Sequence, residues 1–270
     1  MIRVGGFLYR RYVDAEDLGV QFGFSLFETF LVGSGCRIFL LGRHVDRLFR
    51  SLKHFGIALA ADKDEFRRSA ENYARANASE GKVLRVTVTA GSECKGIEPA
   101  VLFSQRDNPY GDESYKRGLS LTLADFRKNE TSPLVTHKTG NYLENYTAYS
   151  AARAKGYDDA LFLNSKNEIT ETAKSNIFFV SQRALHTPEI GCGLLPGIIR
   201  EWVTEKAASL GISCTEGRYT LEELLCSDEV FATNSVMGIM PVTFVNGHKK
   251  PAPGENSVTR ALMELYERSV

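Results

Sequence analysis

The first third of the chain alternates between strand-like and helix-like patterns of apolar positions. Residues 26–31 and 36–41 are two short apolar runs that flank a Gly-Ser-Gly turn, and they predict a β-hairpin. Apolar side chains between 45 and 55 recur every three or four positions, which predicts a helix ending near Gly56. The same criteria predict two further elements, a helix over 62–78 and a strand over 83–89.

The stretch 107–117 is polar, with no aliphatic side chain except a proline ring, and it predicts a connection between domains. We therefore expect a smaller N-terminal α/β domain over 1–108, a linker over 109–117, and a larger C-terminal domain over 118–270. Beyond the linker the pattern predicts four strands and two helices: strands near 119–123, 159–163, 176–180 and 229–233, and helices over 142–155 and from Pro196-Gly197 to Gly211. The predicted fold class is mixed α and β.

Composition narrows the partners that this chain can have. Acidic and basic residues both total 33, so the net charge is zero and nothing favours nucleic acid or an anionic membrane. No apolar run approaches the ~18 residues that span a bilayer. The five cysteines are scattered, which is typical of reduced thiols in the cytoplasm, and the five histidines show no metal-binding spacing. We expect a small-molecule substrate and no metal.

Three places carry residues suited to chemistry, and each also has an ordinary explanation. Lys138 precedes a predicted helix, and most lysines in such positions are surface charges, although a tuned amine there can attack a carbonyl. Glu171 ends a polar stretch and is equally compatible with a solvated loop. The start of the helix at Gly197 and the segment 233–235 offer backbone N–H and hydroxyl donors for a phosphate.

Six stretches in chain order resemble the class IV aminotransferases, whose members have the pyridoxal-phosphate (PLP) fold type IV. Alone each match is weak, but together they cover nearly the whole chain. The resemblance implies a two-domain fold like that of D-amino-acid aminotransferase, PLP as cofactor, and a homodimer. The matching stretches are 21–29 (like "YGxGxFE"), 44–51 (like "HxxRLxxS"), 138–142 (the lysine motif), 171–178 (like "ExxxxNxF"), 195–200, and 228–242.

The resemblance also implies roles for individual residues. Lys138 would hold PLP as a Schiff base and move the proton at the reacting carbon. Glu171 would face the pyridine nitrogen and keep it protonated, and Tyr142 would hydrogen-bond the phenolic oxygen of the ring. The remaining cofactor residues would bind the phosphate, Arg47 and Ser235 through side chains and Ile198 and Ile199 through their N–H groups.

Two departures from the family pattern concern the phosphate end and the rim of the site. Position 199 is isoleucine where the family often has threonine, which removes a hydroxyl donor and keeps the backbone N–H. Phe24-Ser25 replaces a frequent Asp-Gly pair, so this part of the rim is expected to differ in shape. Neither departure involves the lysine or the glutamate.

Within the family, two features are more typical of 4-amino-4-deoxychorismate lyases than of aminotransferases. Thr29 stands where branched-chain aminotransferases usually have glycine, and similar lyases use a threonine there to pass a proton to the leaving group. The stretch 233–241 also resembles the lyase pattern "NSLMGIxP". The lyase reaction would give 4-aminobenzoate and pyruvate, a step of folate biosynthesis.

Two alternatives stay open. The first is a branched-chain or other amino-acid aminotransferase that transfers an amino group to 2-oxoglutarate, because the same cofactor chemistry serves both reactions. A D-specific aminotransferase is disfavoured because Ala90 stands where such enzymes carry a carboxylate-binding arginine. The second alternative is a protein that binds PLP or a related phosphate without turnover.

Overall fold

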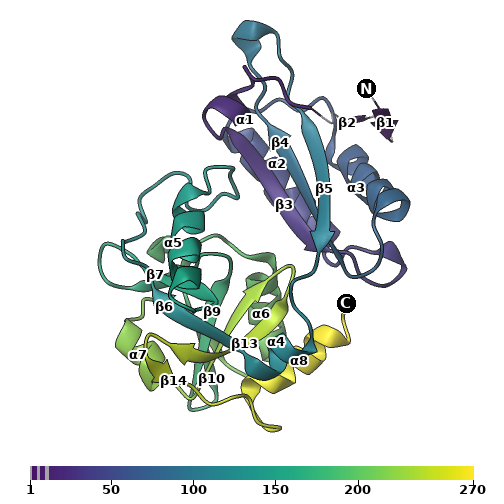
Figure 1. Cartoon of the computed structure of the whole chain (residues 1–270). Helices are drawn as coiled ribbons and strands as arrows, with labels where there is room; N and C mark the ends of the chain where they lie inside the picture. Colours follow the sequence, from purple (N-terminus) through teal and green to yellow (C-terminus); the bar gives the residue numbers. More distant parts are fainter. Residues whose placement is uncertain (1, 5–6, 10–11) are drawn as a thin grey trace. The chain divides into compact units, whose positions relative to one another are not determined.

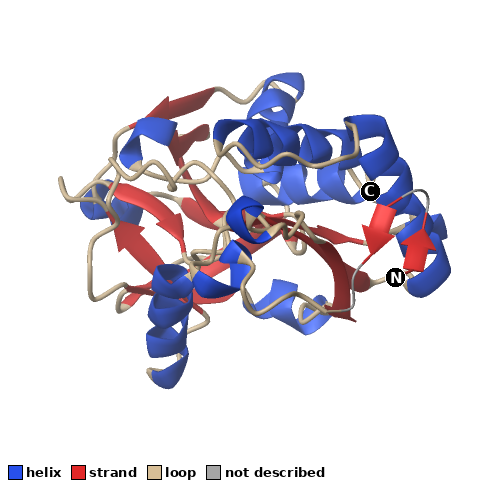
Figure 2. Ribbon diagram, turned by 90° about the horizontal axis from the view of Figure 1, so that it is seen from above, coloured by secondary structure: helices blue, strands red, loops and turns tan. Residues whose placement is uncertain are grey.

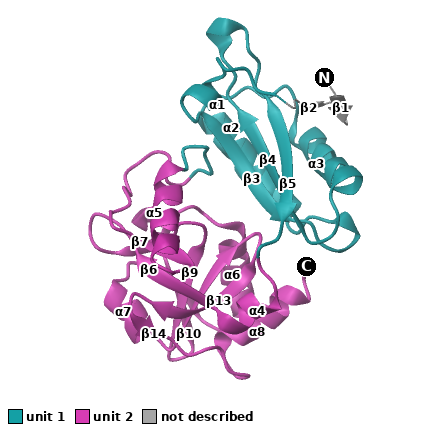
Figure 3. Cartoon of the chain, viewed as in Figure 1, with its two compact units in different colours: residues 1–109, 137–142, 270 teal, residues 110–136, 143–269 magenta. Residues whose placement is uncertain are grey.

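The computed structural model describes residues 2–4, 7–9 and 12–270, and its chain divides into two compact units (Figure 3). The first unit contains residues 1–109, 137–142 and 270, and the second contains 110–136 and 143–269. Both units combine helices and strands (Figure 2). Among the described residues, no helix is long and apolar enough to cross a membrane.

The first unit is built on a five-stranded sheet in the order β1-β2-β5-β4-β3 (Figure 1). The strands β3, β4 and β5 are antiparallel neighbours, and β2 runs parallel to β5. Its strands are β1 (Ile2–Val4), β2 (Phe7–Tyr9), β3 (Ser25–Leu31), β4 (Lys82–Thr89) and β5 (Val101–Asp107), and its helical segments are α1 (Leu18–Gln21), η1 (Ser34–Cys36), α2 (Leu41–His54), α3 (Lys63–Asn77) and η2 (Glu93–Lys95).

One face of this sheet carries the core of the unit. Alternate residues of β3, β4 and β5 are apolar and buried, and they pack against the apolar stripes of α2 and α3. The start of α3 is fixed by a capping box in which Asp62 and Glu65 exchange hydrogen bonds with each other's backbone. The predicted strands over 26–31 and 83–89 and the two predicted helices are confirmed within one or two residues.

The predicted second strand of the hairpin, residues 36–41, is wrong. Only one backbone bridge forms, between Val32 and Ile38, and the turn becomes the short helical segment η1. Leu40 adopts a left-handed conformation and α2 begins at the next residue. The apolar side chains of this segment are used in another way, because Cys36 and Ile38 pack against the core of the unit. An apolar run alone therefore did not distinguish a strand from a packed connection.

The predicted linker also differs from the structure. Residues 112–117 form a helix, α4 (Asp112–Arg117), which starts with acidic residues and ends with basic ones as the helix dipole favours. From Tyr110 onward this stretch belongs to the second unit, while residues 137–142 belong to the first. The boundary near residue 109 agrees with the prediction, but the chain returns to the first unit once more before continuing.

The second unit contains a closed ring of six strands. The strands follow the order β9-β12-β13-β6-β7-β8, and β8 pairs with β9 as well as with β7. Outside the ring β10 pairs with β9, β11 with β10, and β14 with β13. The strands are β6 (Leu119–Leu123), β7 (Asp159–Leu163), β8 (Ile169–Thr172), β9 (Asn176–Ser181), β10 (Ala184–Pro188), β11 (Cys214–Gly217), β12 (Glu229–Asn234), β13 (Gly238–Val245) and β14 (His248–Lys249).

Apolar side chains from every strand of the ring form one core, which includes Leu121, Leu161, Ile177 and Met240. Helices pack around the ring, α5 against β7, α6 against β12, and α8 against β12 and β13. The helical segments besides α4 are α5 (Leu143–Ala154), η3 (Ile190–Cys192), α6 (Ile198–Ser209), α7 (Leu221–Cys226) and α8 (Val258–Glu267). The predicted elements near 119, 142, 159, 176, 196 and 229 are all present.

A buried carboxyl group at the start of β7 leads to a prediction about stability. Asp159 is 5% exposed, and burial raises its pKa to about 6 although the Thr172 hydroxyl, the Ala160 N–H and Lys174 all favour the charged form. The folded protein therefore keeps a proton that the unfolded chain loses near pH 4. The stability lost to this group grows as the pH rises from about 4 to about 6, and stays constant above that.

We expect Asp159→Asn to stabilise the protein by about 2 kcal/mol at pH 7.5 and to have little effect at pH 4, because the amide is neutral at both. Denaturant unfolding at the two pH values measures this. Asp158→Asn is the matched control with the opposite sign, because Arg117 and Ser120 hold the pKa of Asp158 below its ordinary value against the effect of burial. An equal shift at both pH values would show that packing, and not charge, decides the effect at Asp159.

Candidate active site

A buried ion pair lies between β3 and α2 in the first unit. Arg47 donates from Nε to Oε1 of Glu28 at 2.8 Å and from Nη2 to Oε2 at 2.7 Å. His44, one turn earlier on the same helix, has its Nδ1 2.7 Å from Oε2 of the same carboxylate. All three side chains are buried. A polar stripe on α2 thus faces a glutamate in an otherwise apolar stretch of β3.

The charges of this cluster follow from its contacts. Burial would raise the pKa of Glu28, but Arg47 and His44 overcome that effect and lower it to about 2. Burial lowers the pKa of His44, and Glu28 offsets this only in part. The cluster therefore holds one carboxylate and one guanidinium beside a neutral imidazole that donates from Nδ1. The contact of Arg47 with a phosphate stays a prediction; Nε and Nη2 of its guanidinium are already held by Glu28.

Lys138 lies in a segment that pairs with β3, the edge strand of the first sheet. The Phe27 N–H donates to the Lys138 carbonyl at 2.9 Å, and the Gly140 N–H donates to the Ser25 carbonyl at 2.7 Å. Glycine is required at 140, since a Cβ there would lie 2.1 Å from the Ser25 hydroxyl oxygen. The Lys138 ammonium sits 4.5 Å from the centre of the Phe27 ring. Backbone pairing therefore fixes the start of the lysine side chain.

Lys138 is also held through its neighbour in sequence. His137 Nδ1 lies 2.8 Å from the Ser51 hydroxyl of α2, and its ring stacks on His54 at 4.4 Å. Ser51 is one turn beyond Arg47 on the helix that carries the buried cluster. The residues of the predicted "HxxRLxxS" stretch therefore hold both the Glu28 carboxylate and the segment of Lys138.

The face of the sheet opposite the core carries a group of polar side chains around Phe27. Phe27 and Thr29 alternate with the buried Glu28 and so project from this other face. Tyr142 contacts the Phe27 ring edge-on, with centroids 5.7 Å apart. The Arg85 guanidinium of β4 lies 3.5 Å from the centre of the same ring, and Arg85 pairs directly opposite Thr29. Two cations and a hydroxyl therefore surround one aromatic ring.

Glu171 in the second unit is buried and bound by three donors. The Lys128 ammonium donates to Oε1 at 3.0 Å, and the Leu195 N–H donates to Oε2 at 3.1 Å. Asn176, which faces Glu171 across β8 and β9, donates from Nδ2 to Oε2 at 3.5 Å. The predicted alternative of a solvated loop carboxylate is wrong, because the whole residue is 6% exposed.

The start of α6 lies beside Asn176. The Asn176 amide donates to the Leu195 carbonyl at 2.9 Å, and a Cβ on Gly197 would lie 1.9 Å from its oxygen, so only glycine fits there. Gly197 begins α6 without a side-chain cap, which leaves its first N–H groups available to an anion. Ile198 and Ile199 are the first two residues of the helix, and their side chains are buried.

A buried hydroxyl without a partner lies nearby on β12. Thr233 pairs with Asn176 across β9 and β12 and is 1% exposed, yet its Oγ1 has no hydrogen-bond partner among the residues that the structure describes. Buried hydroxyls are rarely left unsatisfied unless a ligand or water completes them. Ser235, half-buried, follows in the turn between β12 and β13. These donors fit a phosphate-bearing ligand.

The eight predicted site residues thus fall into two groups. The first unit brings together Thr29, Lys138 and Tyr142 around Phe27, and holds Arg47 in the buried cluster. The second unit holds Glu171 and, near Asn176, the start of α6. Sequence reasoning missed Glu28, His44, Arg85 and Lys128. A glutamate within an apolar strand was the only local signal, since the others become recognisable only through pairing across strands.

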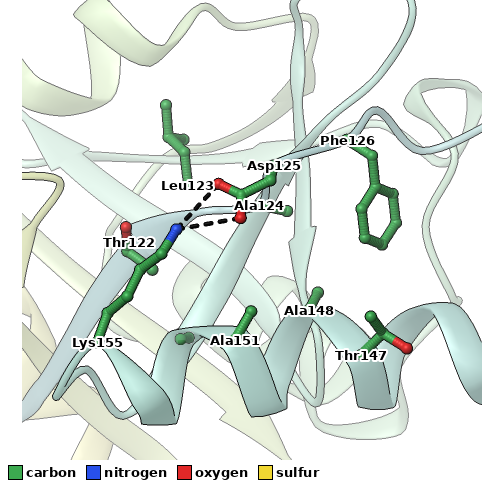
Figure 4. Close-up of a pocket in the computed structure, with 10 residues that line it drawn as sticks. Thr122, Leu123, Ala124, Asp125, Phe126, Thr147, Ala148, Ala151 and Lys155 are labelled. Atoms are coloured by element: carbon green, nitrogen blue, oxygen red, sulfur yellow. Dashed lines mark hydrogen bonds and ion pairs between the residues drawn. The ribbon is translucent and has the colours of Figure 1, made fainter.

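A hollow of about 170 Å³ between the end of β6 and α5 does not contain any of these residues (Figure 4). Its lining is mainly Ala148, Ala151 and neighbouring small side chains, and Lys155 and Asp125 form a partly exposed ion pair at its side. In the part of the chain that the structure describes, no three potential metal ligands gather at one place. The candidate active site therefore rests on the two groups above.

Comparisons with known proteins agree with the fold and the candidate residues. The profile of the family "Amino-transferase class IV" matches residues 25–245. An aminodeoxychorismate lyase of Bacillus subtilis is 30% identical, over 100% of this chain and 94% of that protein. A branched-chain-amino-acid aminotransferase of Pseudomonas aeruginosa is 27% identical, over 92% of this chain and 84% of that protein.

A solved structure adds evidence for the fold. A branched-chain amino acid aminotransferase from T.th., solved with pyridoxamine 5'-phosphate, superposes with a TM-score of 0.86, over 96% of this chain and 88% of that one, at 24% identity. This likeness confirms the predicted mixed α/β fold. Because the family profile covers most of the chain and a relative of 30% identity covers all of it, the chain belongs to the class IV aminotransferase family.

Proposed function

We propose that this chain is a PLP-dependent 4-amino-4-deoxychorismate lyase that releases pyruvate and forms 4-aminobenzoate. Enzymes of the family use PLP, and the second unit offers what a phosphorylated pyridine needs. Glu171 supplies a buried carboxylate for a ring nitrogen, and the open start of α6 supplies N–H donors for a phosphate. The unpartnered Thr233 hydroxyl near that helix start supports the same fit.

When bound, PLP supplies the electron-accepting ring that this reaction requires. Lys138 would hold the cofactor covalently through Nζ and then carry the proton from the substrate carbon. Tyr142, placed edge-on to Phe27 beside Lys138, would orient the ring through its hydroxyl. Glu171 would hold a proton on the ring nitrogen, and Arg47, Ile198, Ile199 and Ser235 would bind the phosphate.

The observation that carries the lyase proposal is the position of Thr29. Its side chain is on the same face of β3 as Phe27, whose ring contacts the Lys138 ammonium. Among the described residues none forms a hydrogen bond with its hydroxyl, so that group stays available to donate a proton to the departing enolpyruvyl oxygen. Arg85, directly opposite Thr29, adds a cation suited to a substrate with carboxylates.

A class IV aminotransferase of branched-chain type is the second candidate. The relative from Pseudomonas aeruginosa is nearly as similar as the lyase, and the lysine and glutamate serve either reaction. The two are separated by assaying the purified protein with aminodeoxychorismate and, in parallel, with leucine plus 2-oxoglutarate. We expect pyruvate from the first and little glutamate from the second. The reverse result would overturn the lyase proposal, and no turnover with either would favour a protein that only binds PLP.

We expect Thr29→Val to lower pyruvate release by about two decades, the usual loss when a positioned acid is removed. Valine keeps the branched shape and the strand preference. Thr29→Ser is the matched control, because it keeps a hydroxyl and should retain most of the activity. If Thr29 only packs in the strand, Thr29→Val instead changes stability by about 1 kcal/mol and leaves the rate unchanged. PLP binding should survive in both variants.

The partners and location follow from the family. We propose that the protein acts in the cytoplasm as a homodimer on a small amine or amino acid, and size-exclusion chromatography with light scattering tests the dimer.

A further inference from the structure

Lys128 is a buried cation. Its backbone N–H donates to the Leu163 carbonyl at 2.9 Å, which places it beyond β6 and alongside the end of β7. Its side chain is 8% exposed, and the ammonium also lies 4.8 Å from the centre of the Phe162 ring. Lysine is rarely buried to this degree unless its charge is paired. The paired charge here is that of Glu171, 3.0 Å away.

A second contact ties Lys128 to the loop that follows Glu171. The ammonium donates to Oδ1 of Asn145 at 3.2 Å, and the Asn145 amide donates to the carbonyl of Ala173 at 2.9 Å. Glu171 thus receives Lys128 on Oε1, while Leu195 and Asn176 hold Oε2. The carboxylate cannot rotate without losing one of these donors. Its position and its charge balance are both set by buried neighbours.

This arrangement raises a question of charge. A carboxylate that stabilises a protonated ring nitrogen acts most strongly when no other cation shares it. In a buried setting an ion pair at 3.0 Å is only weakly screened, so Lys128 competes with such a nitrogen for the same charge. Without Lys128, Glu171 would be an uncompensated buried charge before any ligand arrives, which is strongly destabilising.

We propose that Lys128 is a positioning residue that balances the Glu171 charge in the cofactor-free protein and shares it with the ring nitrogen of PLP in the loaded one. This inference rests on the proposed role of Glu171. It assigns Lys128 two opposing effects: it stabilises the empty protein, and it moderates how strongly Glu171 attracts the cofactor. A purely structural ion pair would have only the first effect.

The test measures thermal unfolding of the wild-type protein and of Lys128→Met, each without PLP and reloaded with PLP. Methionine fills similar volume without the charge. We expect the cofactor-free variant to unfold about 5–10 °C below the wild type. We also expect PLP to raise the Tm of the variant by about 3–5 °C more than it raises that of the wild type, because the ring nitrogen then replaces the missing cation.

Controls separate charge from shape. Lys128→Arg keeps the cation and should behave as the wild type in the size of its PLP-induced rise. Lys155→Met removes the partly exposed partner of Asp125 in the same unit and should change neither value by more than about 1–2 °C. If Lys128→Met does not fold, Lys128→Gln keeps a donor for Glu171 while removing the charge, and should show the same excess rise.

A double-mutant cycle without cofactor tests the pair independently of PLP. Lys128→Met combined with Glu171→Gln should unfold at a higher temperature than the sum of the two single losses predicts. Strict additivity, or a PLP-induced rise equal to that of the wild type, overturns the role proposed for Lys128. No PLP-induced rise in the wild type overturns the proposed function instead, and with it the sharing of the Glu171 charge.

Discussion

Lys138→Ala is expected to abolish covalent attachment of PLP and to reduce turnover by about four decades or more. One residue would supply both the nucleophile that binds the cofactor and the group that moves the proton, and a positioned proton carrier alone is typically worth ~10²–10⁴-fold. Borohydride reduction followed by peptide mapping gives the direct measurement. The wild-type label should lie on the peptide that contains Lys138, and the variant should carry none.

The variant should still fold. The pairing of its segment with β3 uses the carbonyl of residue 138 and the N–H of Gly140, and alanine keeps both. The contact with Phe27 is a cation–π interaction, whose loss costs about 1 kcal/mol. Lys53→Ala, an exposed lysine of α2, is the matched control and should retain label and activity. A label on another lysine in the wild type would contradict the assignment of Lys138.

Elements with a strong local pattern could be predicted from the sequence, and α3 shows why. Its apolar stripe sets the helix, and Asp62 with Glu65 sets its start, so all the information lies within one stretch. The segment 36–41 had an equally apolar pattern but lacked a partner strand, and its side chains were used to cover the core. Whether an apolar run pairs or packs depends on residues distant in the sequence.

The chain path and the closure of the ring were beyond local reasoning for the same cause. Residues 137–142 belong to the first unit because Gly140 can approach Ser25 closely, more than a hundred positions away. The ring closes because β8 pairs with both β7 and β9, which no single strand reveals. Helix α4 was missed because its six polar residues carry no apolar stripe, although their charges follow the helix dipole.

The candidate site shows the same division. Resemblance to the family identified Lys138 and Glu171 by their motifs, but the partners that set their charge and orientation are not adjacent to them in sequence. Lys128 precedes Glu171 by 43 positions and Arg47 follows Glu28 by 19. Such pairs are chosen by the fold, so a sequence pattern shows the functional group more readily than the residue that tunes it.

Glu171→Gln is expected to lower turnover by about two to three decades while PLP stays bound. A neutral amide no longer favours the protonated ring nitrogen, so the electron-accepting capacity of the ring falls, and losing one preorganised charge of this kind costs about 3–4 kcal/mol. Glutamine keeps the size of the side chain and an acceptor for the Leu195 N–H. Rates should be measured per cofactor-loaded protein, with bound PLP counted by absorbance after release.

The variant also leaves the Lys128 ammonium buried with only Asn145 as a hydrogen-bond acceptor among its described contacts, so a loss of stability is expected beside the loss of rate. Combining Glu171→Gln with Lys128→Met removes that penalty without returning a charge to the ring nitrogen. The double variant should therefore regain stability but not turnover, which separates the two consequences. Glu222→Gln, an exposed glutamate on α7, is the matched control and should keep both. Near-wild-type turnover in Glu171→Gln would place the partner of the ring nitrogen elsewhere, because no amide can hold that proton as a carboxylate does.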